Sequence, residues 1–476
     1  MARPEFDLAV IGGGSGGLVV AAGGAALGAK VALVEKDKLG GDCLWTGCVP
    51  SKTLIESARV AFQMRNANRW ALTAHDPKPD LAAVMKRVAR VIEGIEPNDS
   101  PERFRSLGVD VIIGHGQFVG RDAFEVNGRR LIARSFVIAT GSRPATLPLP
   151  GLDGVPYLTN ETVFTLRERV PHLIVLGAGP IGSELAQAFR RLGSEVSVVD
   201  IAPVILPRED ADLAGVVFRQ MQAEGVRYHL GASAAQVERT VSGLRLLIRD
   251  NQGTPRPIDA THLLIAVGRK VNVEGLGLDA AGVEVDQGRI VLREGLQTTN
   301  RNVYVVGDVA GGYQFTHLAE HHAGIVLRQT IFRMTWAKPA AVIPWCTFTD
   351  PELARVGLSE TEARKSGVAH RVYRFPFADI DRARAGGETE GMAKIVTSPR
   401  GKLLGAAVVG SHAGEIIAEY ALALSQGLSA SDLSDTIHVY PTLAQINRRV
   451  ADQRRNEGLT PAAKKWIRRI FRLRGS

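Results

Sequence analysis

The chain of 476 residues has only 3 Cys, and aromatic residues make up just 6% of it. Three cysteines are too few for the disulfide framework that stabilises small secreted domains. No run of about 18 or more uninterrupted apolar residues occurs, so the sequence predicts no transmembrane helix. The N-terminal residues lead directly into an apolar, strand-like run and leave no room for a signal peptide, so we expect a cytoplasmic protein.

The net charge of +9 does not indicate a basic protein surface. From residue 448 to the C-terminus there are ten Lys or Arg residues, opposed only by Asp452 and Glu457, so this segment carries +8. The rest of the chain is therefore nearly neutral at +1. Because the excess charge belongs to a tail, we expect no nucleic-acid-binding surface.

Glycine is abundant, at 51 residues, and three glycines open the chain's first motif. An apolar strand over residues 7–11 is followed by a G-x-G-x-x-G spacing at Gly12, Gly14 and Gly17. The first glycine makes the turn, the second lets a pyrophosphate approach, and the third lets helix and strand touch. A second strand ends at Glu35, which would accept hydrogen bonds from an adenosine ribose. These features predict a dinucleotide site.

The same pattern recurs after a strand over residues 172–176, with its glycines at Gly177, Gly179 and Gly182. The next strand ends at Asp200, and an acid there binds a free 2′-hydroxyl and repels a 2′-phosphate. Two dinucleotide sites suggest that one dinucleotide passes electrons to the other, with NADH preferred over NADPH. Arg190 and Arg191, in the intervening helix, are expected on a solvated face.

Two thiols separated by four residues, Cys43 and Cys48, follow the first motif, and Lys52 lies four residues further on. This run predicts a redox disulfide beside a flavin, because a thiolate is the species that exchanges with disulfides. Lys52 would help to stabilise the developing anion. Cys346 lies in an apolar run and is expected to be simply packed.

Together these motifs resemble the pyridine nucleotide-disulfide oxidoreductases, which include glutathione reductase, dihydrolipoamide dehydrogenase and mercuric reductase. The resemblance covers residues 5–450 and includes further runs at 139–144, 267–269, 302–308 and 349–357. It implies an α/β fold with two Rossmann-like domains and a C-terminal α+β dimerisation domain, hence a homodimer. The expected divisions are an FAD-binding domain at 1–150 and 270–340, an NAD(P)H-binding domain at 151–269, a dimerisation domain at 341–450, and a tail at 451–476.

The resemblance also implies residue roles. Cys48 would lie against the flavin ring, Cys43 would attack the substrate, and Lys52 would lie near flavin N5, paired with Glu184. Asp308 would bind the ribityl chain of FAD. Further cofactor contacts are expected at Thr140, Gly141 and Gly307 for FAD, and at Gly268 and Arg269 for the pyridine nucleotide.

The chain departs from the family at its proton-transfer residues. Disulfide reductases end in His-Pro-Thr-x-x-Glu, whereas here Tyr440 occupies the His position and Gln445 the Glu position. Neither side chain titrates near neutral pH as His does. A general acid–base contributes about 10²–10⁴-fold, so we expect weak dithiol–disulfide turnover, with Tyr440 as the candidate replacement. His438, two residues away, is expected to be an ordinary surface or core histidine.

Mercuric reductases also lack this His and use tyrosines, but they end in a vicinal cysteine pair, and here the last cysteine is Cys346. Trp45, inside the cysteine loop, would offer either a stacking surface or simple packing. The sequence therefore predicts an FAD-dependent NAD(P)H oxidoreductase that reduces a disulfide, thiol-reactive or metal acceptor. Mercuric reductase, a dihydrolipoamide dehydrogenase-like enzyme and a non-catalytic redox-sensing flavoprotein at a membrane are the alternatives.

The tail over residues 459–476 predicts a basic amphipathic helix, capped by Thr460 with Pro461 in its first turn. Trp466, Ile470 and Leu473 share one face, and Lys and Arg fill most of the rest. Such a helix docks on an anionic membrane surface or a membrane partner, or packs on its own dimer.

Overall fold

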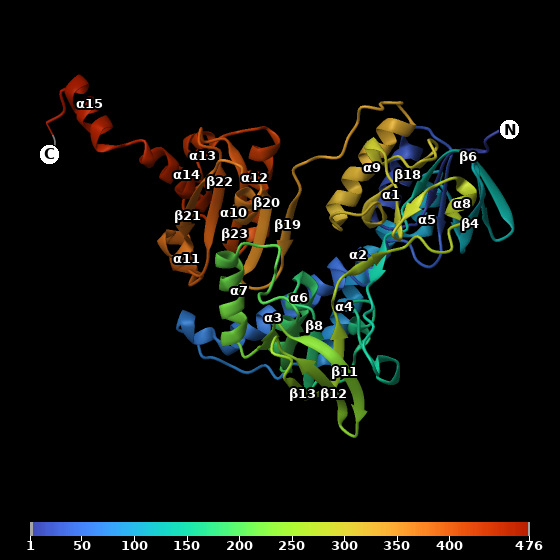
Figure 1. The fold of residues 1–476 in the computed structure, drawn as a ribbon, viewed down its shortest axis with the longest axis horizontal. Helices are drawn as coiled ribbons and strands as arrows, with labels where there is room; N and C mark the ends of the chain where they lie inside the picture. Colours follow the sequence, from blue (N-terminus) through green and yellow to red (C-terminus); the bar gives the residue numbers. More distant parts are fainter. Residues whose placement is uncertain (1–2, 475–476) are drawn as a thin grey trace.

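The computed structural model describes residues 3–474, which form three lobes and a projecting C-terminal helix (Figure 1). The first lobe is built on a seven-stranded sheet ordered β3-β2-β1-β6-β5-β4, with β18 paired to β6. Its strands are β1 (Phe6–Ile11), β2 (Val31–Glu35), β3 (Asp110–Ile113), β4 (Gly116–Gly120), β5 (Ala123–Val126), β6 (Arg129–Ile138) and β18 (Val303–Val305). Since β18 comes from far along the chain, two separate segments build this lobe.

Two helices pack side by side on one face of this sheet, α1 (Ser15–Ala26) and α9 (Thr316–Thr330). Leu18 of α1 and Val326 of α9 share one buried cluster with Leu33 of β2. The parallel strands β1, β2, β3, β6 and β18 are apolar along most of their length, as expected for strands covered on both faces.

The second lobe has a parallel sheet ordered β10-β9-β8-β14 and an antiparallel sheet of β11, β12 and β13. Its strands are β8 (His172–Leu176), β9 (Glu195–Asp200), β10 (Arg227–Leu230), β11 (Ser233–Thr240), β12 (Gly243–Arg249), β13 (Pro255–Ala260) and β14 (His262–Ile265). Its helices are α6 (Pro180–Arg191) and α7 (Ala211–Ala223). The chain enters and leaves along the paired strands β7 (Ser142–Pro144) and β15 (Arg269–Val271).

Two helices that precede this lobe in sequence nevertheless pack on it, α3 (Cys48–Arg65) and α4 (Leu81–Ile95). Leu54 of α3 and Met85 of α4 share a buried cluster with Leu173 of β8 and Leu185 of α6. In Figure 1 both blue helices lie beside the green second lobe. Cys48 therefore begins a helix that leads from the first lobe into the core of the second.

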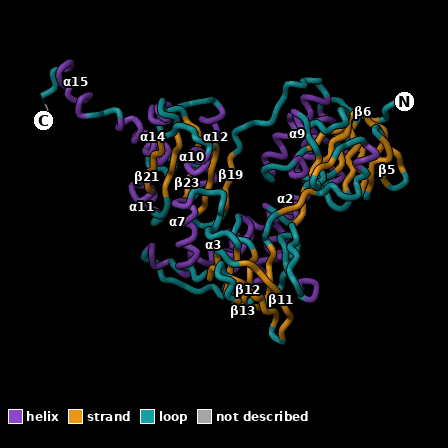
Figure 2. The backbone as a smooth tube through the Cα atoms, in the orientation of Figure 1, coloured by secondary structure: helices purple, strands orange, loops and turns teal. Residues whose placement is uncertain are grey.

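The third lobe is a five-stranded antiparallel sheet ordered β19-β20-β23-β22-β21, with helices around it (Figure 2). Its strands are β19 (Pro344–Thr347), β20 (Glu352–Gly357), β21 (Arg371–Pro376), β22 (Met392–Thr397) and β23 (Leu403–Gly410). Its helices are α10 (Glu360–Lys365), α11 (Asp381–Gly386), α12 (Ala413–Ser425), α13 (Ala430–Asp435) and α14 (Gln445–Glu457). This arrangement confirms the expected α/β class with a C-terminal α+β domain.

Two further findings bear on the sequence analysis. Within residues 3–474, no helix is both long and apolar enough to cross a membrane. The expectation that Arg190 and Arg191 lie on a solvated face is wrong. Arg191 is 4% exposed and pairs with Glu224 at 2.6 Å and Asp350 at 2.7 Å, and Arg190 donates to the Glu224 carbonyl. Sequence spacing gave no sign of Glu224 and Asp350, because both come from distant segments.

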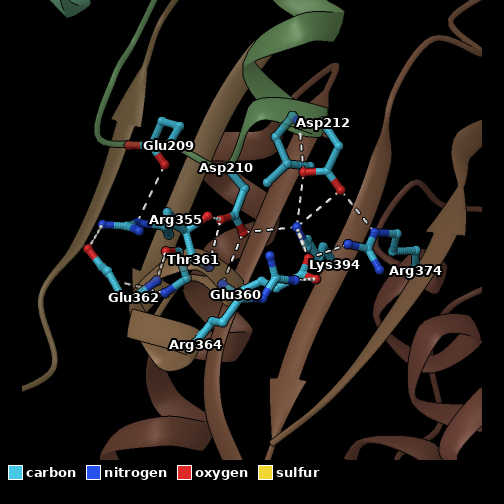
Figure 3. A network of polar contacts seen from close by, with 12 residues as sticks. Glu209, Asp210, Asp212, Arg355, Glu360, Thr361, Glu362, Arg364, Arg374 and Lys394 are labelled. Atoms are coloured by element: carbon cyan, nitrogen blue, oxygen red, sulfur yellow. Dashed lines mark hydrogen bonds and ion pairs between the residues drawn. The ribbon is translucent and has the colours of Figure 1, made fainter. Parts of the chain in front are cut away.

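A buried network of charges joins the second and third lobes (Figure 3). The Lys394 ammonium on β22, 2% exposed, lies 2.9 Å from Asp210, 2.9 Å from Asp212 and 2.6 Å from Glu360. Burial opposes ionisation of Asp210, but hydrogen bonds from Thr361 and Lys394 outweigh it and lower its pKa to about 2. The stability that the ionised Asp210 carboxylate contributes to the fold is therefore complete above about pH 4, the ordinary carboxyl pKa. This contribution is lost as the pH falls through about 2.

Replacing Lys394 by Met should lower the free energy of unfolding by about 3–5 kcal/mol, because the buried carboxylates would lose their common partner. Urea unfolding at pH 7 measures this change. Arg364→Ala is the matched control, since the 71% exposed Arg364 side chain pairs only at the surface of the same network and should cost less than about 1 kcal/mol. Equal losses in the two variants would contradict the assigned role of Lys394.

Candidate redox site

The cysteine-bearing loop begins directly on the first glycine turn. The Gly40 amide donates to the Gly13 carbonyl at 2.9 Å, and Gly14 and Gly40 form an isolated β-bridge. A Cβ on Gly41 would come 2.7 Å from the Gly14 Cα, so the two backbones approach as closely as glycine allows. The candidate nucleotide turn and the redox loop are therefore one packed unit.

Cys43 lies in the short helix α2 (Gly41–Trp45), and Cys48 is the first residue of α3. Both are free cysteines in this structure. The interaction with Cys48, followed by burial, raises the pKa of Cys43 far above its ordinary value. The interaction with Cys43 lowers the pKa of Cys48 to about 6 against the effect of burial, with further help from Lys52 and Thr316. The pair is thus polarised, with the thiolate favoured at Cys48 and the thiol at Cys43.

Thr316 is a site residue that the sequence analysis missed. It is the first residue of α9, and its hydroxyl lies 3.7 Å from the Cys48 sulfur. Its only sequence signal is its place eight residues after Asp308, and nothing in that spacing indicates contact with a residue of α3. The hydroxyl is placed to stabilise a thiolate at Cys48.

The expected pair of Lys52 and Glu184 is present, at 2.8 Å. Lys52 lies one turn after Cys48 on α3, and Glu184 belongs to α6 of the second lobe. The other Glu184 oxygen accepts from the backbone N–H of Phe348, whose ring lies 4.4 Å from the Lys52 ammonium. Burial opposes a charge on Lys52, but Glu184 outweighs it and raises the pKa of the ammonium. Lys52 thus stays cationic beside Cys48.

The first glycine motif has the geometry that a dinucleotide requires. Gly12 has φ +111°, and a Cβ there would come 2.3 Å from the Ala139 carbonyl oxygen; a Cβ on Gly17 would come 1.9 Å from the Gly12 carbonyl oxygen. The Gly13 amide donates to Glu35 at 2.7 Å, which holds this carboxylate at the rim of the turn. These residues fit the adenosine diphosphate portion of FAD.

The second motif repeats that geometry in the second lobe. Gly177 has φ +108°, and a Cβ on Gly182 would come 1.9 Å from the Gly177 carbonyl oxygen. The Ala178 amide donates to Asp200 at 2.6 Å, just as Gly13 donates to Glu35. Gly14 and Gly179 occupy the N-cap positions of α1 and α6, whose free N–H groups favour a phosphate.

The remaining expected flavin residues gather where β6, β15 and β18 end. The Ser142 hydroxyl donates to Asp308 at 2.5 Å, and burial raises the pKa of that carboxyl. Thr140 donates to the Asn272 carbonyl at 2.6 Å, and the Asn272 amide donates back to Gly141. Gly307 immediately precedes Asp308 and has φ +73°. A partly buried carboxyl beside the glycine turn suits a polar chain such as the ribityl group.

Arg269, expected to contact the pyridine nucleotide, lies among the residues expected to hold the flavin, and its contact with the pyridine nucleotide stays a prediction. Its guanidinium donates to Ser142 at 2.8 Å and lies 3.2 Å from Asp42 and 3.8 Å from Asp308. Gly268, with φ +132°, makes the turn between β14 and β15. Arg269 thereby connects the cysteine loop, through Asp42, to the Asp308 cluster.

Three side chains near the expected site, Trp45, His438 and Cys346, have defined positions. The Trp45 indole donates to the Leu39 carbonyl at 2.7 Å and packs against a buried cluster, which favours packing over a free stacking surface. His438 is held by Glu419 at 3.0 Å and by the Thr436 carbonyl, so both ring nitrogens are engaged. Cys346 is half-buried, and burial raises the pKa of its thiol.

Tyr440, by contrast, is 66% exposed on the third lobe, and its hydroxyl donates to Asp381 at 3.2 Å. Its neighbours Ile437 and Val439 are 91% and 75% exposed, and Leu422 of α12 is 63% exposed. Such a concentration of exposed apolar side chains marks a protein interface. Within this one chain, the structure gives Tyr440 no contact with the cysteine pair.

Comparisons with known proteins agree with this arrangement. Residues 6–323 match the family model of the pyridine nucleotide-disulphide oxidoreductases, and residues 343–450 match their dimerisation domain. A dihydrolipoyl dehydrogenase of Chlamydia muridarum is 35% identical over 93% of this chain and 95% of its own length. A mercuric reductase of Bacillus cereus is 34% identical over 93% of this chain and 70% of its own length.

Among solved structures, the chain is similar to the HOCl-induced flavoprotein disulfide reductase RclA of Escherichia coli, solved as a Cu(II) complex. The TM-score is 0.84 with 26% sequence identity, covering 95% of this chain and 100% of that one.

The long-wavelength thiolate–flavin absorbance of the two-electron-reduced protein should depend on pH with a midpoint near 6, because the Cys48 thiolate forms above the lowered pKa of that thiol. An anaerobic pH titration of the FAD-loaded protein measures this. Lys52→Met should move the midpoint upward, since a neighbouring cation is lost, whereas Lys38→Met, on the neighbouring loop, should leave it unchanged. A midpoint above 8 in the unaltered protein would contradict the polarised pair.

Proposed function

Because the chain belongs to the FAD-dependent pyridine nucleotide-disulfide oxidoreductases, we propose that it uses NADH to reduce a soft metal ion or another thiol-reactive acceptor at the Cys43–Cys48 pair. The observation that carries this proposal is the position of Cys48, one turn before Lys52 on α3 and 3.7 Å from the Thr316 hydroxyl, where these neighbours help to lower the pKa of its thiol to about 6. A thiolate present at neutral pH is a soft ligand and a nucleophile.

The electron balance of the proposed cycle is simple. FAD held by the first glycine turn would supply the two-electron redox chemistry between the hydride of NADH and the Cys43–Cys48 disulfide, with Lys52 beside Cys48. The Cys43–Cys48 disulfide accepts two electrons and two protons and opens to two thiols, of which Cys48 ionises readily. With Cu(II) as acceptor, the pair returns the two electrons to two copper ions, which become Cu(I), while the disulfide reforms and two protons leave.

The proton-handling residues favour such an acceptor over a disulfide. A disulfide substrate needs an acid to protonate the thiolate that leaves it, whereas a metal ion does not. The hydroxyl of Tyr440 donates to Asp381, and Gln445 has no ionisable side chain. The two positions at which the family has its proton-transfer pair therefore hold neither a His nor a Glu.

The relatives support the same class of acceptor. One similar protein is a mercuric reductase, and the similar flavoprotein disulfide reductase was solved with Cu(II). Among residues 3–474, no group of three or more His, Cys, Asp or Glu side chains is arranged to hold a metal ion. Two sulfurs form an open site, which suits a metal that must leave after reduction.

A second candidate is a dihydrolipoyl dehydrogenase, since several such enzymes are 32–37% identical over more than nine-tenths of this chain. The replacement of both members of the proton-transfer pair argues against it.

The dimerisation domain indicates a homodimer. In the proposed dimer, Tyr440 and its exposed apolar neighbours would face the active site of the other subunit.

Restoring the family's pair should redirect the enzyme. The double variant Tyr440→His, Gln445→Glu is expected to gain about 10-fold or more in lipoamide turnover, because a general acid–base would be supplied. Its Cu(II) reduction should change little. Steady-state NADH oxidation with Cu(II), Hg(II), lipoamide and glutathione disulfide compares the two proteins, with Tyr440→Phe as the control. Faster turnover of a disulfide than of either metal by the unaltered enzyme would overturn the proposed acceptor class.

Asp200 should set the preference for NADH. We expect Asp200→Ser to raise the KM for NADH and to lower the KM for NADPH by about 10-fold, since a carboxylate that repels the 2′-phosphate is removed. Glu195→Ser, at the other end of β9 and exposed, is the matched control. An unaltered enzyme that uses NADPH as efficiently as NADH would contradict this assignment.

A further inference from the structure

The C-terminal helix α15 (Pro461–Phe471) has no packing partner in the described chain. Thr460 caps its first turn by accepting from the Ala463 N–H at 3.1 Å, which confirms the expected start of the helix. None of its residues is buried. Figures 1 and 2 show it projecting from the end of α14 beyond the third lobe, away from the other two. The helix therefore buries no face against the described part of the chain.

One face of this helix exposes large apolar side chains to solvent. Trp466 is 69% exposed, Ile470 49%, Phe471 67% and Leu473 55%. Trp466 and Ile470 are four residues apart and so lie on one stripe, Phe471 ends the helix next to Ile470, and Leu473 follows directly after the helix. Exposed aromatic and aliphatic side chains that adjoin one another mark a surface that a partner covers.

The opposite face carries only positive charge. Lys464, Lys465, Arg468, Arg469 and Arg472 are all exposed, and residues 458–476 contain no Asp or Glu. Four of these cations, Lys464, Lys465, Arg468 and Arg469, lie within the helix, and at 3.6 residues per turn they form a continuous arc that is separate from the arc of Trp466, Ile470 and Phe471. A partner must therefore present both an apolar surface and negative charge.

We propose that α15 binds the surface of an anionic lipid membrane, with its apolar face inserted between head groups and its basic face toward the lipid phosphates. An anionic bilayer offers both an apolar interior for the apolar face and negatively charged head groups for the basic face. A second copy of the helix would bring like charges together, and a nucleic acid would pair with the basic face but leave Trp466, Ile470 and Phe471 in water. This attachment lies outside the redox site, so it would place the enzyme at a membrane without taking part in the reaction.

Co-sedimentation of the full-length holoenzyme with vesicles tests the proposal. Vesicles of phosphatidylglycerol and phosphatidylcholine should bind at least 10-fold more protein than pure phosphatidylcholine vesicles. Deletion of residues 459–476 should abolish this binding and leave NADH-dependent turnover unchanged, which separates this test from the proposed function. Lys464→Glu with Arg468→Glu should also abolish it, whereas Lys86→Glu with Arg90→Glu, an equal charge change on α4, should not.

The apolar face is tested separately. Trp466→Ser with Ile470→Ser should reduce vesicle binding at least 10-fold, and vesicles should shift the tryptophan emission of the unaltered protein to the blue but not that of Trp466→Phe. Vesicle binding that survives deletion of the helix, or that survives loss of the apolar side chains, would overturn the proposal. Helix-dependent binding to duplex DNA or helix-dependent self-association, without vesicle binding, would overturn it in favour of those partners.

Discussion

The ion pair between Lys52 and Glu184 is the contact on which the redox site depends. It joins α3 to α6 at 2.8 Å, and Glu184, with a side chain 6% exposed, also accepts from the Phe348 N–H at the start of the third lobe. One carboxylate thus connects α3, α6 and the residue that follows β19. The Lys52 side chain is 35% exposed, so the pair itself adds little to stability, but removing Lys52 would leave the buried Glu184 carboxylate without its charged partner.

The same ion pair also affects the ionisation of Cys48, which lies one helical turn away on α3. Lys52 favours the anionic form of Cys48, and Glu184 keeps Lys52 charged despite its burial. The glycine turn contributes from the other side, because Gly40 and Gly41 pack on Gly13 and Gly14 and so set where the cysteine loop begins. Nucleotide binding, thiolate formation and lobe packing are consequently parts of one local arrangement.

Features that depend on short-range spacing can be predicted from the sequence. The glycine turns, the acids that end β2 and β9, and the cap of α15 are all local patterns with a local physical cause. The resemblance to the family supplied the pairing of Lys52 with Glu184. Thr316 and the burial of Arg191 could not be found this way, because each depends on a contact between distant segments that no periodicity encodes. Arg269 lies at a lobe crossing, where sequence alone cannot say which side its side chain joins.

We propose that electrons reach the acceptor through the sulfur pair and not directly from the flavin. Anaerobic single turnover distinguishes the two routes: the enzyme is reduced with one equivalent of NADH and then mixed with Cu(II) and a Cu(I)-specific chelator. Two Cu(I) per NADH should form in the unaltered enzyme. In Cys43→Ser and Cys48→Ser, NADH should still bleach the flavin, but Cu(I) should form at least 100-fold more slowly. Equal rates of Cu(I) formation in all three proteins would contradict the account.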